Sequence, residues 1–217
     1  MAGVGLVGVI ELLAALVGLI QILDPARAIH LDDGSSFSLW LMLQSLIAVV
    51  SLATFLPAIV LFLVWLHRTY TNLPALRSDS TEFTAGWAIG WWFIPFANLV
   101  KPYQVVRNVW AESDPDLELE SGFLTSVQAG APGFMMVWWA FWILSNIASN
   151  ITGNLFDPTD MRTVVLSGYL FIAAGILRAI ASVFAIKVIH AITTRQEQRF
   201  ARLGHGGIGA DHSVNWS

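Results

Sequence analysis

Four stretches of the sequence are apolar over lengths that a soluble domain seldom shows. A helix needs about 20 apolar residues to cross the roughly 30 Å hydrocarbon core of a bilayer. Three stretches meet this length easily, and one meets it with polar interruptions. They cover residues 3–23, 39–66, 133–151 and 164–189. The sequence therefore predicts an all-α, polytopic integral membrane protein with four transmembrane helices.

The composition supports this prediction and excludes several other classes. Apolar residues make up 56% of the chain and charged residues only 12%, whereas about 25% is usual for charged residues in soluble domains. Disordered chains, coiled coils and basic nucleic-acid-binding proteins do not have this composition. The chain contains no cysteine, which excludes disulfides, thiolate metal sites and cysteine nucleophiles.

The sequence predicts a single membrane domain over residues 1–203, because no polar linker is long enough for a separate soluble domain. The glycine-rich residues 204–217 are expected to form a flexible C-terminal tail. A signal peptide is an alternative for the first apolar stretch. That stretch lacks a basic leading region and exceeds the usual apolar length of about 7–15 residues, which favours a span.

The positions of Lys and Arg predict the orientation. With four spans, one side of the membrane receives eight basic residues and the other receives two. The eight are Arg68, Arg77, Lys101, Arg107, Lys187, Arg195, Arg199 and Arg202, and the two are Arg27 and Arg162. Because the cytoplasmic side carries the excess of basic residues, we expect a plasma-membrane protein with both termini in the cytoplasm. The basic helix after Ile189 suits anionic lipid headgroups at that face.

Residues 86–110 do not fit the pattern of a span. The apolar stretch before Lys101 has only about 15 residues and includes a proline and an asparagine, which is typical of an interfacial or re-entrant helix. We expect a Trp-rich helix that covers the cytoplasmic mouth of the bundle, and a substrate or lipid-headgroup site on the same segment is the alternative. The residues that define it are Trp87, Trp91, Trp92, Pro95, Asn98, Lys101, Pro102, Tyr103, Arg107 and Trp110.

This segment also carries a resemblance to a known family. The pattern is Trp65-x-x-Arg68, Gly86-Trp87, Gly90-x-Trp92-x-x-Pro95-x-x-Asn98-x-x-x-Pro102-Tyr103 and Arg107-x-x-Trp110. It resembles a bacterial, largely actinobacterial, membrane-protein family described as domain of unknown function 4328. The resemblance covers about Trp40 to Arg199 and implies four or so spans around the central segment. It implies no reaction, ligand or catalytic residue.

Two charged residues lie inside the predicted spans, Glu11 and Arg178. At 1.5 Å per residue, Glu11 is about 12 Å and Arg178 about 18 Å from the cytoplasmic ends of their spans. An unpaired charge near the bilayer centre costs about 2.5–3.5 kcal/mol, so each needs a partner. Both lie on faces of small residues, which allow close helix packing. We expect an ion pair that joins the first and last spans, either as a structural link or as part of a proton or ion path.

A second polar set lies on the two middle spans. Gln44, Ser51 and Thr54 fall roughly on one face, and Asn146 and Asn150 lie four residues apart on the next span. Such groups usually form hydrogen bonds between helices, at about 0.6 kcal/mol each. The alternative is that Gln44, Ser51, Asn146 and Asn150 line a hydrated cavity.

Histidines and acidic residues offer weaker candidates. His67 and His190 lie at cytoplasmic ends of spans, where interfacial caps are common, although paired histidines could also hold a haem or a metal. Acidic residues occupy every second position from Glu112 to Glu120. Their spacing does not match a calcium loop, so we expect a solvated acidic loop.

The function that the sequence favours is a non-enzymatic scaffold or sensing protein that binds a partner. No P-loop, Ser/His/Asp order, HExxH motif or dinucleotide fingerprint is present, and we expect no cofactor and no metal. The expected partners are the lipid bilayer with its anionic headgroups, and further copies of the chain or other membrane proteins, but not nucleic acid. The alternatives are a small oligomeric transporter or channel, and, more distantly, an enzyme that acts on lipids or contains haem.

Overall fold

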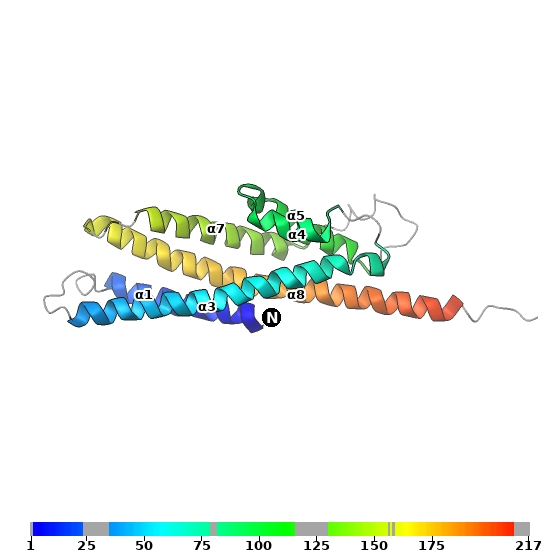
Figure 1. Cartoon of the computed structure of the whole chain (residues 1–217), viewed down its shortest axis with the longest axis horizontal. Coiled ribbons are helices and arrows are strands. Elements are labelled where there is room, and N and C mark those ends of the chain that lie inside the picture. Colours follow the sequence, from blue (N-terminus) through cyan, green and yellow to red (C-terminus); the bar gives the residue numbers. More distant parts are fainter. Residues whose placement is uncertain are drawn as a thin grey trace, which may run out of the picture. The chain divides into compact units, whose positions relative to one another are not determined.

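The computed structural model is helical throughout its regular elements (Figure 1). It describes residues 2–23, 35–78, 82–115, 130–155, 157 and 159–210. The α-helices in these residues are α1 (Ala2–Leu23), α3 (Ser35–Thr71), α4 (Ala85–Gly90), α5 (Lys101–Glu112), α7 (Gly133–Leu155) and α8 (Met161–Ala210). Short 3-10 turns occupy Pro74–Leu76, Trp91–Phe93 and Ala97–Leu99. No strand occurs in the described residues, which confirms the predicted all-α class.

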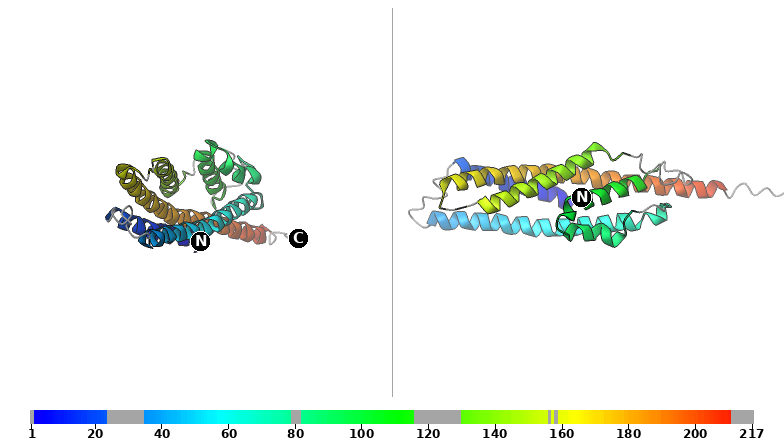
Figure 2. Two further views of the ribbon diagram at one scale, coloured as in Figure 1. Left: turned by 60° about the vertical axis from the view of Figure 1, so that its left-hand side comes forward. Right: turned by 90° about the horizontal axis from the view of Figure 1, so that it is seen from above.

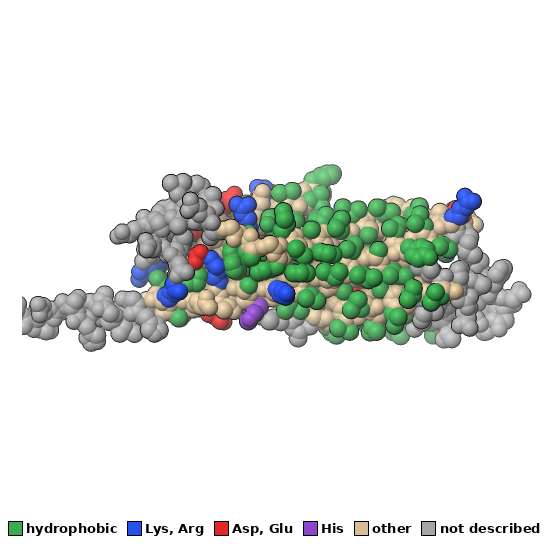
Figure 3. All heavy atoms as spheres, turned by 180° about the vertical axis from the view of Figure 1, so that it is seen from behind, with side chains coloured by type: hydrophobic (Ala, Val, Ile, Leu, Met, Phe, Trp, Pro, Cys, Tyr) green, Lys and Arg blue, Asp and Glu red, His purple; other side chains and the backbone are tan. Residues whose placement is uncertain are grey.

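Three helices are long and apolar enough to cross a membrane. The apolar stretches are Ser45–Thr71 in α3, Gly133–Leu155 in α7 and Arg162–Gly204 in α8. The first predicted span is also a helix, but among the described residues its apolar stretch is shorter, Gly3–Leu19. Large hydrophobic side chains are exposed along these helices (Figure 3), as a lipid environment requires. These features are consistent with a membrane protein.

The helices extend beyond the predicted spans. α3 begins at Ser35 and ends at Thr71, and it continues through Pro57. α8 reaches Ala210, so the tail predicted from residue 204 begins as helix and its remaining part lies outside the described residues. Hydropathy predicts where a helix enters lipid, but a helix ends only where its backbone hydrogen bonding stops, which explains the difference.

Contacts divide the chain into two compact units. The first unit comprises Met1–Leu61 and Met136–Ile186, and the second comprises Phe62–Met135 and Lys187–Ser217. α3 and α8 each contribute to both units as single continuous helices (Figure 2). The predicted residues 1–203 therefore contain two contact units.

In the first unit, α1 packs closely against α8 through glycine. A Cβ atom at Gly8 would lie 3.2 Å from the Cβ of Ser182, and one at Gly175 would lie 3.1 Å from the carbonyl oxygen of Glu11. At these distances a larger side chain would fit only if the neighbouring helix shifted by a few tenths of an ångström. The small-residue faces expected from the sequence thus face each other across this helix pair.

In the second unit, the segment predicted as one helix over residues 86–110 is a series of short helical pieces. The Thr84 hydroxyl caps α4 by accepting a hydrogen bond from the backbone N–H of Trp87 at 3.3 Å. Pro95 has no N–H to continue a helix, and Phe96 has a φ of 63°, which breaks the helical path. The helical path resumes in α5, whose first turn accommodates Pro102. The prediction of a single Trp-rich helix is therefore wrong for this segment.

Candidate functional site

The two charged residues of the predicted spans are ion-paired in the first unit. Nη1 of Arg178 on α8 donates to Oε1 of Glu11 on α1 at 2.9 Å. Nη2 of Arg178 donates to the hydroxyl of Ser149 on α7 at 2.6 Å. The side chains of Arg178 and Glu11 are 29% and 10% exposed. The guanidinium therefore links three helices, and the ion pair offsets the cost of placing each charge among apolar side chains.

The polar residues predicted to join the middle spans instead bond within their own helices. Nδ2 of Asn146 donates to the carbonyl of Trp142 at 2.7 Å, and Nδ2 of Asn150 donates to the carbonyl of Asn146 at 2.8 Å. Thr54 likewise donates to the carbonyl of Val50 at 2.9 Å. Short polar side chains commonly satisfy themselves in this way on helices. Ser51 is half-buried, and the side chain of Gln44 lies outside the described part of the chain.

A buried polar network in the second unit surrounds Arg199 on α8. Arg199 is only 3% exposed, and its guanidinium donates to the carbonyl oxygens of Leu76 at 2.8 Å, Glu112 at 3.0 Å and Asp114 at 2.9 Å. These oxygens end the 74–76 turn and α5, where backbone carbonyls lack helical partners. One side chain thus satisfies the ends of two separate elements.

Gln196, one turn before Arg199, extends this network. Its Nε2 donates to the carbonyl of Thr69 on α3 at 2.9 Å and to the hydroxyl of Ser113 at 3.1 Å. Arg195 forms an ion pair with Asp114, and its guanidinium lies 4.1 Å from the ring centroid of Trp110. The Arg199 network, defined here as Arg195, Gln196 and Arg199 with their partners, therefore holds the ends of α3 and α5 against α8.

Two of the acidic residues predicted to form a solvated loop belong to this network instead. Glu112 is buried at 2% exposure and accepts a hydrogen bond from the Ser78 hydroxyl. Asp114 is half-buried and paired with Arg195. The expectation of solvation is wrong at these two positions because α5 continues through Glu112 and turns both residues toward other elements. The remaining acidic positions, 116, 118 and 120, lie outside the described residues.

Arg199 is likewise not a headgroup-facing residue, although the sequence placed it on a basic helix suited to anionic lipid. Its guanidinium is enclosed and its donors are used by carbonyl oxygens. Helical periodicity alone does not distinguish a lipid-facing arginine from one covered by a segment distant in sequence. Arg202, in the next turn, is exposed and donates to the carbonyl of Pro115 at 3.3 Å.

Tyr70 connects three parts of the second unit. Its hydroxyl donates to Oδ1 of Asn108 on α5 at 3.0 Å and accepts a hydrogen bond from the backbone N–H of Phe83 at 2.7 Å. The Tyr70 side chain is buried. It therefore positions the short stretch 82–84 that precedes α4.

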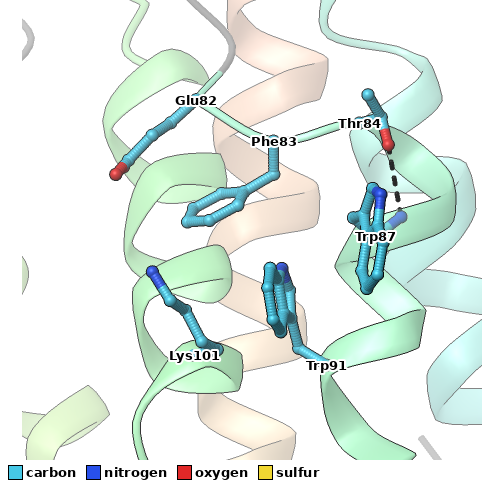
Figure 4. Close-up of a pocket in the computed structure, with 6 residues that line it drawn as sticks. All are labelled: Glu82, Phe83, Thr84, Trp87, Trp91 and Lys101. Atoms are coloured by element: carbon cyan, nitrogen blue, oxygen red, sulfur yellow. Dashed lines mark hydrogen bonds between the residues drawn. The ribbon is translucent and has the colours of Figure 1, made fainter. Parts of the chain in front are cut away.

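An open cleft lies beside this stretch (Figure 4). Its volume is about 510 Å³, and it is lined by Glu82, Phe83, Thr84, Trp87, Trp91 and Lys101. The rings of Trp87 and Trp91 lie with centroids 4.8 Å apart. Nζ of Lys101 lies 5.4 Å from the ring centroid of Phe83 and 5.6 Å from that of Trp91, within the range of cation–π attraction. We call this site the aromatic cleft.

The other residues predicted for this segment have different positions. Trp92 packs edge-on against Phe62 of α3, with ring centroids 5.3 Å apart, and Trp110 packs edge-on against Phe134 at 6.3 Å. Pro102 is buried in α5, whereas Pro95 and Arg107 are exposed and Asn98 and Tyr103 are half-buried. The segment thus divides its tryptophans between helix packing and the cleft.

The two histidines considered as ligands are both exposed. Nδ1 of His67 lies 3.5 Å from the hydroxyl of Thr71, one turn along α3. Among the described residues, no group of three or more His, Asp or Glu side chains is arranged to hold a metal ion.

Sequence reasoning missed Ser149, Gln196 and the burial of Arg199 and Glu112. The only signal was the spacing of Arg195 and Arg199, which puts both on one face of a helix that continues beyond its apolar stretch. That spacing does not reveal which segment covers the face.

Comparison with known proteins identifies a family. The sequence model of the family described as a domain of unknown function (DUF4328) matches residues 34–194. No curated protein and no solved structure matches the chain. The matched range includes Arg178 and the aromatic cleft, whereas Glu11 lies before it and Arg199 after it. Both polar clusters therefore connect the matched region to flanking parts of the chain.

Proposed function

The chain belongs to the family of the domain of unknown function (DUF4328), and we propose that this member is a non-enzymatic, partner-binding scaffold of a bacterial plasma membrane. In this proposal four helices span the membrane, both termini lie in the cytoplasm, and the second unit is the part that binds a protein partner. The observation that carries it is the Arg199 network, which ties three elements of the second unit into one body.

The length of α1 supports a fourth span. Its 22 residues correspond to about 33 Å at 1.5 Å per residue, which matches the hydrocarbon core. Its buried acidic residue is neutralised by Arg178, and its glycines pack closely against α8. Both features are typical of helices that pack together within a membrane.

The distribution of charge supports the orientation. All eight basic residues predicted for the cytoplasmic side belong to the second unit, whereas Arg162 belongs to the first. α8 has 50 residues, or about 75 Å of helix, which is more than twice the hydrocarbon thickness. Its C-terminal part therefore has to extend beyond the bilayer if its N-terminal part spans it.

The second unit also offers a surface that a partner would cover. Phe200 on α8 is 69% exposed, one residue from the buried Arg199 and on a different face of the helix. An exposed aromatic side chain on this unit suits protein binding, since aromatic residues are enriched in interfaces. The transporter alternative has less support because Asn146 and Asn150 donate within α7 and Arg178 is held by Glu11 and Ser149.

Site-specific photo-crosslinking in cells tests the scaffold. We expect p-benzoylphenylalanine in place of Phe200 to give an adduct of defined mass after irradiation, with a band at twice the chain's mass if the partner is a second copy. The matched control is Tyr169, an aromatic residue of the same helix that is 56% exposed in the first unit, where we expect lipid rather than a protein partner. R199Q should abolish the Phe200 adduct. Absence of that adduct, or an equal one at Tyr169, would contradict the proposal.

A further inference from the structure

We propose that the aromatic cleft binds the phosphate of a phospholipid headgroup through Lys101 and prefers a headgroup that also carries a primary ammonium group. This inference concerns a lipid site and does not depend on the scaffold role. It rests on the charge of Lys101, the shape of the cleft, its apolar border and the position of Glu82.

Lys101 provides a positioned positive charge. Its side chain is half-buried, and its ammonium group lies over the rings of Phe83 and Trp91. These contacts hold the ammonium in place without cancelling its charge, because an aromatic quadrupole carries no net charge. Within the described part of the chain, Lys101 forms no salt bridge with a carboxylate. Its positive charge would attract an anion that enters the cleft.

The cleft has the dimensions of a ligand site. Its volume of about 510 Å³ falls within the roughly 300–1,000 Å³ typical of small-molecule sites. Figure 4 shows the rings of Phe83 and Trp91 beside the Lys101 ammonium, with Trp87 next to Trp91 on the side away from Lys101. Aromatic walls and a single cation suit a compact anionic group attached to an apolar body.

Exposed apolar side chains close in sequence to the cleft residues favour a lipid as the source of the anion. Phe93, at the end of the 91–93 turn, is 71% exposed, and Phe96, just before the 97–99 turn, is 84% exposed. The 91–93 turn contacts both α4 and α5. Val100, the neighbour of Lys101, is also exposed. An exposed apolar patch of this kind needs an apolar cover. A bilayer surface supplies acyl chains and phosphates together, which a soluble phosphate does not.

Glu82 sets the expected headgroup preference. Figure 4 shows its carboxylate on the same side of the cleft as the Lys101 ammonium. An anionic headgroup bound at Lys101 would be repelled by this carboxylate, whereas a headgroup with a phosphate and a primary ammonium would satisfy both charges. Phosphatidylethanolamine has this arrangement, and phosphatidylglycerol has the phosphate alone.

The test is native mass spectrometry of the full-length chain in detergent, titrated separately with phosphatidylethanolamine and phosphatidylglycerol. We expect K101Q to weaken phosphatidylethanolamine binding about tenfold, as for loss of one charge-assisted hydrogen bond, and K101R to retain most of it. The control is K187Q, because Lys187 is the only other lysine in the sequence. E82Q should reduce the preference for phosphatidylethanolamine over phosphatidylglycerol.

Each other outcome would overturn the proposal. Equal lipid binding by K101Q and the wild type, or an equal loss in K187Q, would show that the cleft is not the site. Displacement of the lipid by millimolar inorganic phosphate would show a phosphate site without lipid specificity. If K101Q does not fold, E82Q decides: an unchanged preference between the two lipids would refute the assigned headgroup.

Discussion

Arg178 and Arg199 lie on the same helix, but their guanidinium groups donate to different kinds of acceptor. Arg178 is paired with a carboxylate and a hydroxyl in the first unit. Arg199 in the second unit donates to three carbonyl oxygens within 3.0 Å. In an apolar environment a guanidinium needs a counter-charge. At the ends of helices it can use the partial negative charge of unpaired carbonyls.

At the residue scale, the Glu11–Arg178 pair predicts strong coupling between its members. E11Q and R178Q should each destabilise the chain, because each leaves one charge unpaired at a cost of about 2.5–3.5 kcal/mol. The double variant E11Q/R178Q should lose less than the sum, by about 1–3 kcal/mol. Unfolding by SDS in mixed micelles measures all four proteins.

The control for this cycle is S149A. It removes one hydrogen bond of Arg178 and leaves the ion pair, so its cost should be about 0.6 kcal/mol. Additive effects of E11Q and R178Q would mean that the two side chains do not interact in the membrane.

At the element scale, hydrogen bonds to the ends of helices hold the elements of the second unit together. α5 is amphipathic and buries Val105, Val106 and Val109, but its C-terminal carbonyl groups depend on Arg199. The Tyr70 hydroxyl on α3 donates to Asn108 of the same helix and accepts from the N–H of Phe83. α5 is therefore held both by apolar contacts and by polar contacts to α3 and α8.

Replacing Arg199 should therefore loosen α5 selectively. R199Q leaves buried carbonyl groups without hydrogen-bond donors, and each such group costs about 1–3 kcal/mol of stability. R199K should be almost as destabilising, because a lysine ammonium cannot reproduce the planar arrangement of guanidinium donors. Hydrogen exchange followed by mass spectrometry should show faster exchange in residues 101–115 and little change in α1.

The matched variant is R202Q, which removes the exposed arginine of the next turn. Its exchange pattern should resemble that of the wild type. Unchanged exchange of α5 in R199Q would show that apolar packing alone holds the helix.

At the scale of the whole molecule, two long helices each contribute to both units. α3 and α8 carry apolar stretches and continue into the second unit, where their residues are bonded to segments between Leu76 and Asp114. Charge follows the same division, since the predicted cytoplasmic basic residues all belong to the second unit. The proposed membrane topology therefore coincides with the division into two units.

Cysteine accessibility tests this topology, and the chain has no cysteine to interfere. In intact cells, a membrane-impermeant maleimide should label a cysteine at Thr159, between α7 and α8. It should not label one at Ala2 or at Phe200 until the cells are permeabilised. Labelling at Ala2 in intact cells would mean that α1 does not span the membrane and that three spans are present.

The part that could be predicted was local in sequence or forced by the membrane. Apolar length was sufficient for the helices because a backbone in hydrocarbon must satisfy its own hydrogen bonds. Glu11 and Arg178 could be matched because few charges occur within apolar stretches, and each had to find a counter-charge. The break at Pro95 and Phe96 was not predicted, since Phe has no intrinsic preference for a positive φ.

The sequence by itself determined the all-helical class, the apolar stretches and the charge pair between the first and last of them. Only the tertiary structure decided that Arg199 is enclosed, that Glu112 and Asp114 belong to its network, and that Lys101 lies in an aromatic cleft. The physical reason is separation along the chain. Arg199 meets Leu76 and Glu112 across 123 and 87 positions, and helical periodicity shows which face a residue occupies but not what covers it.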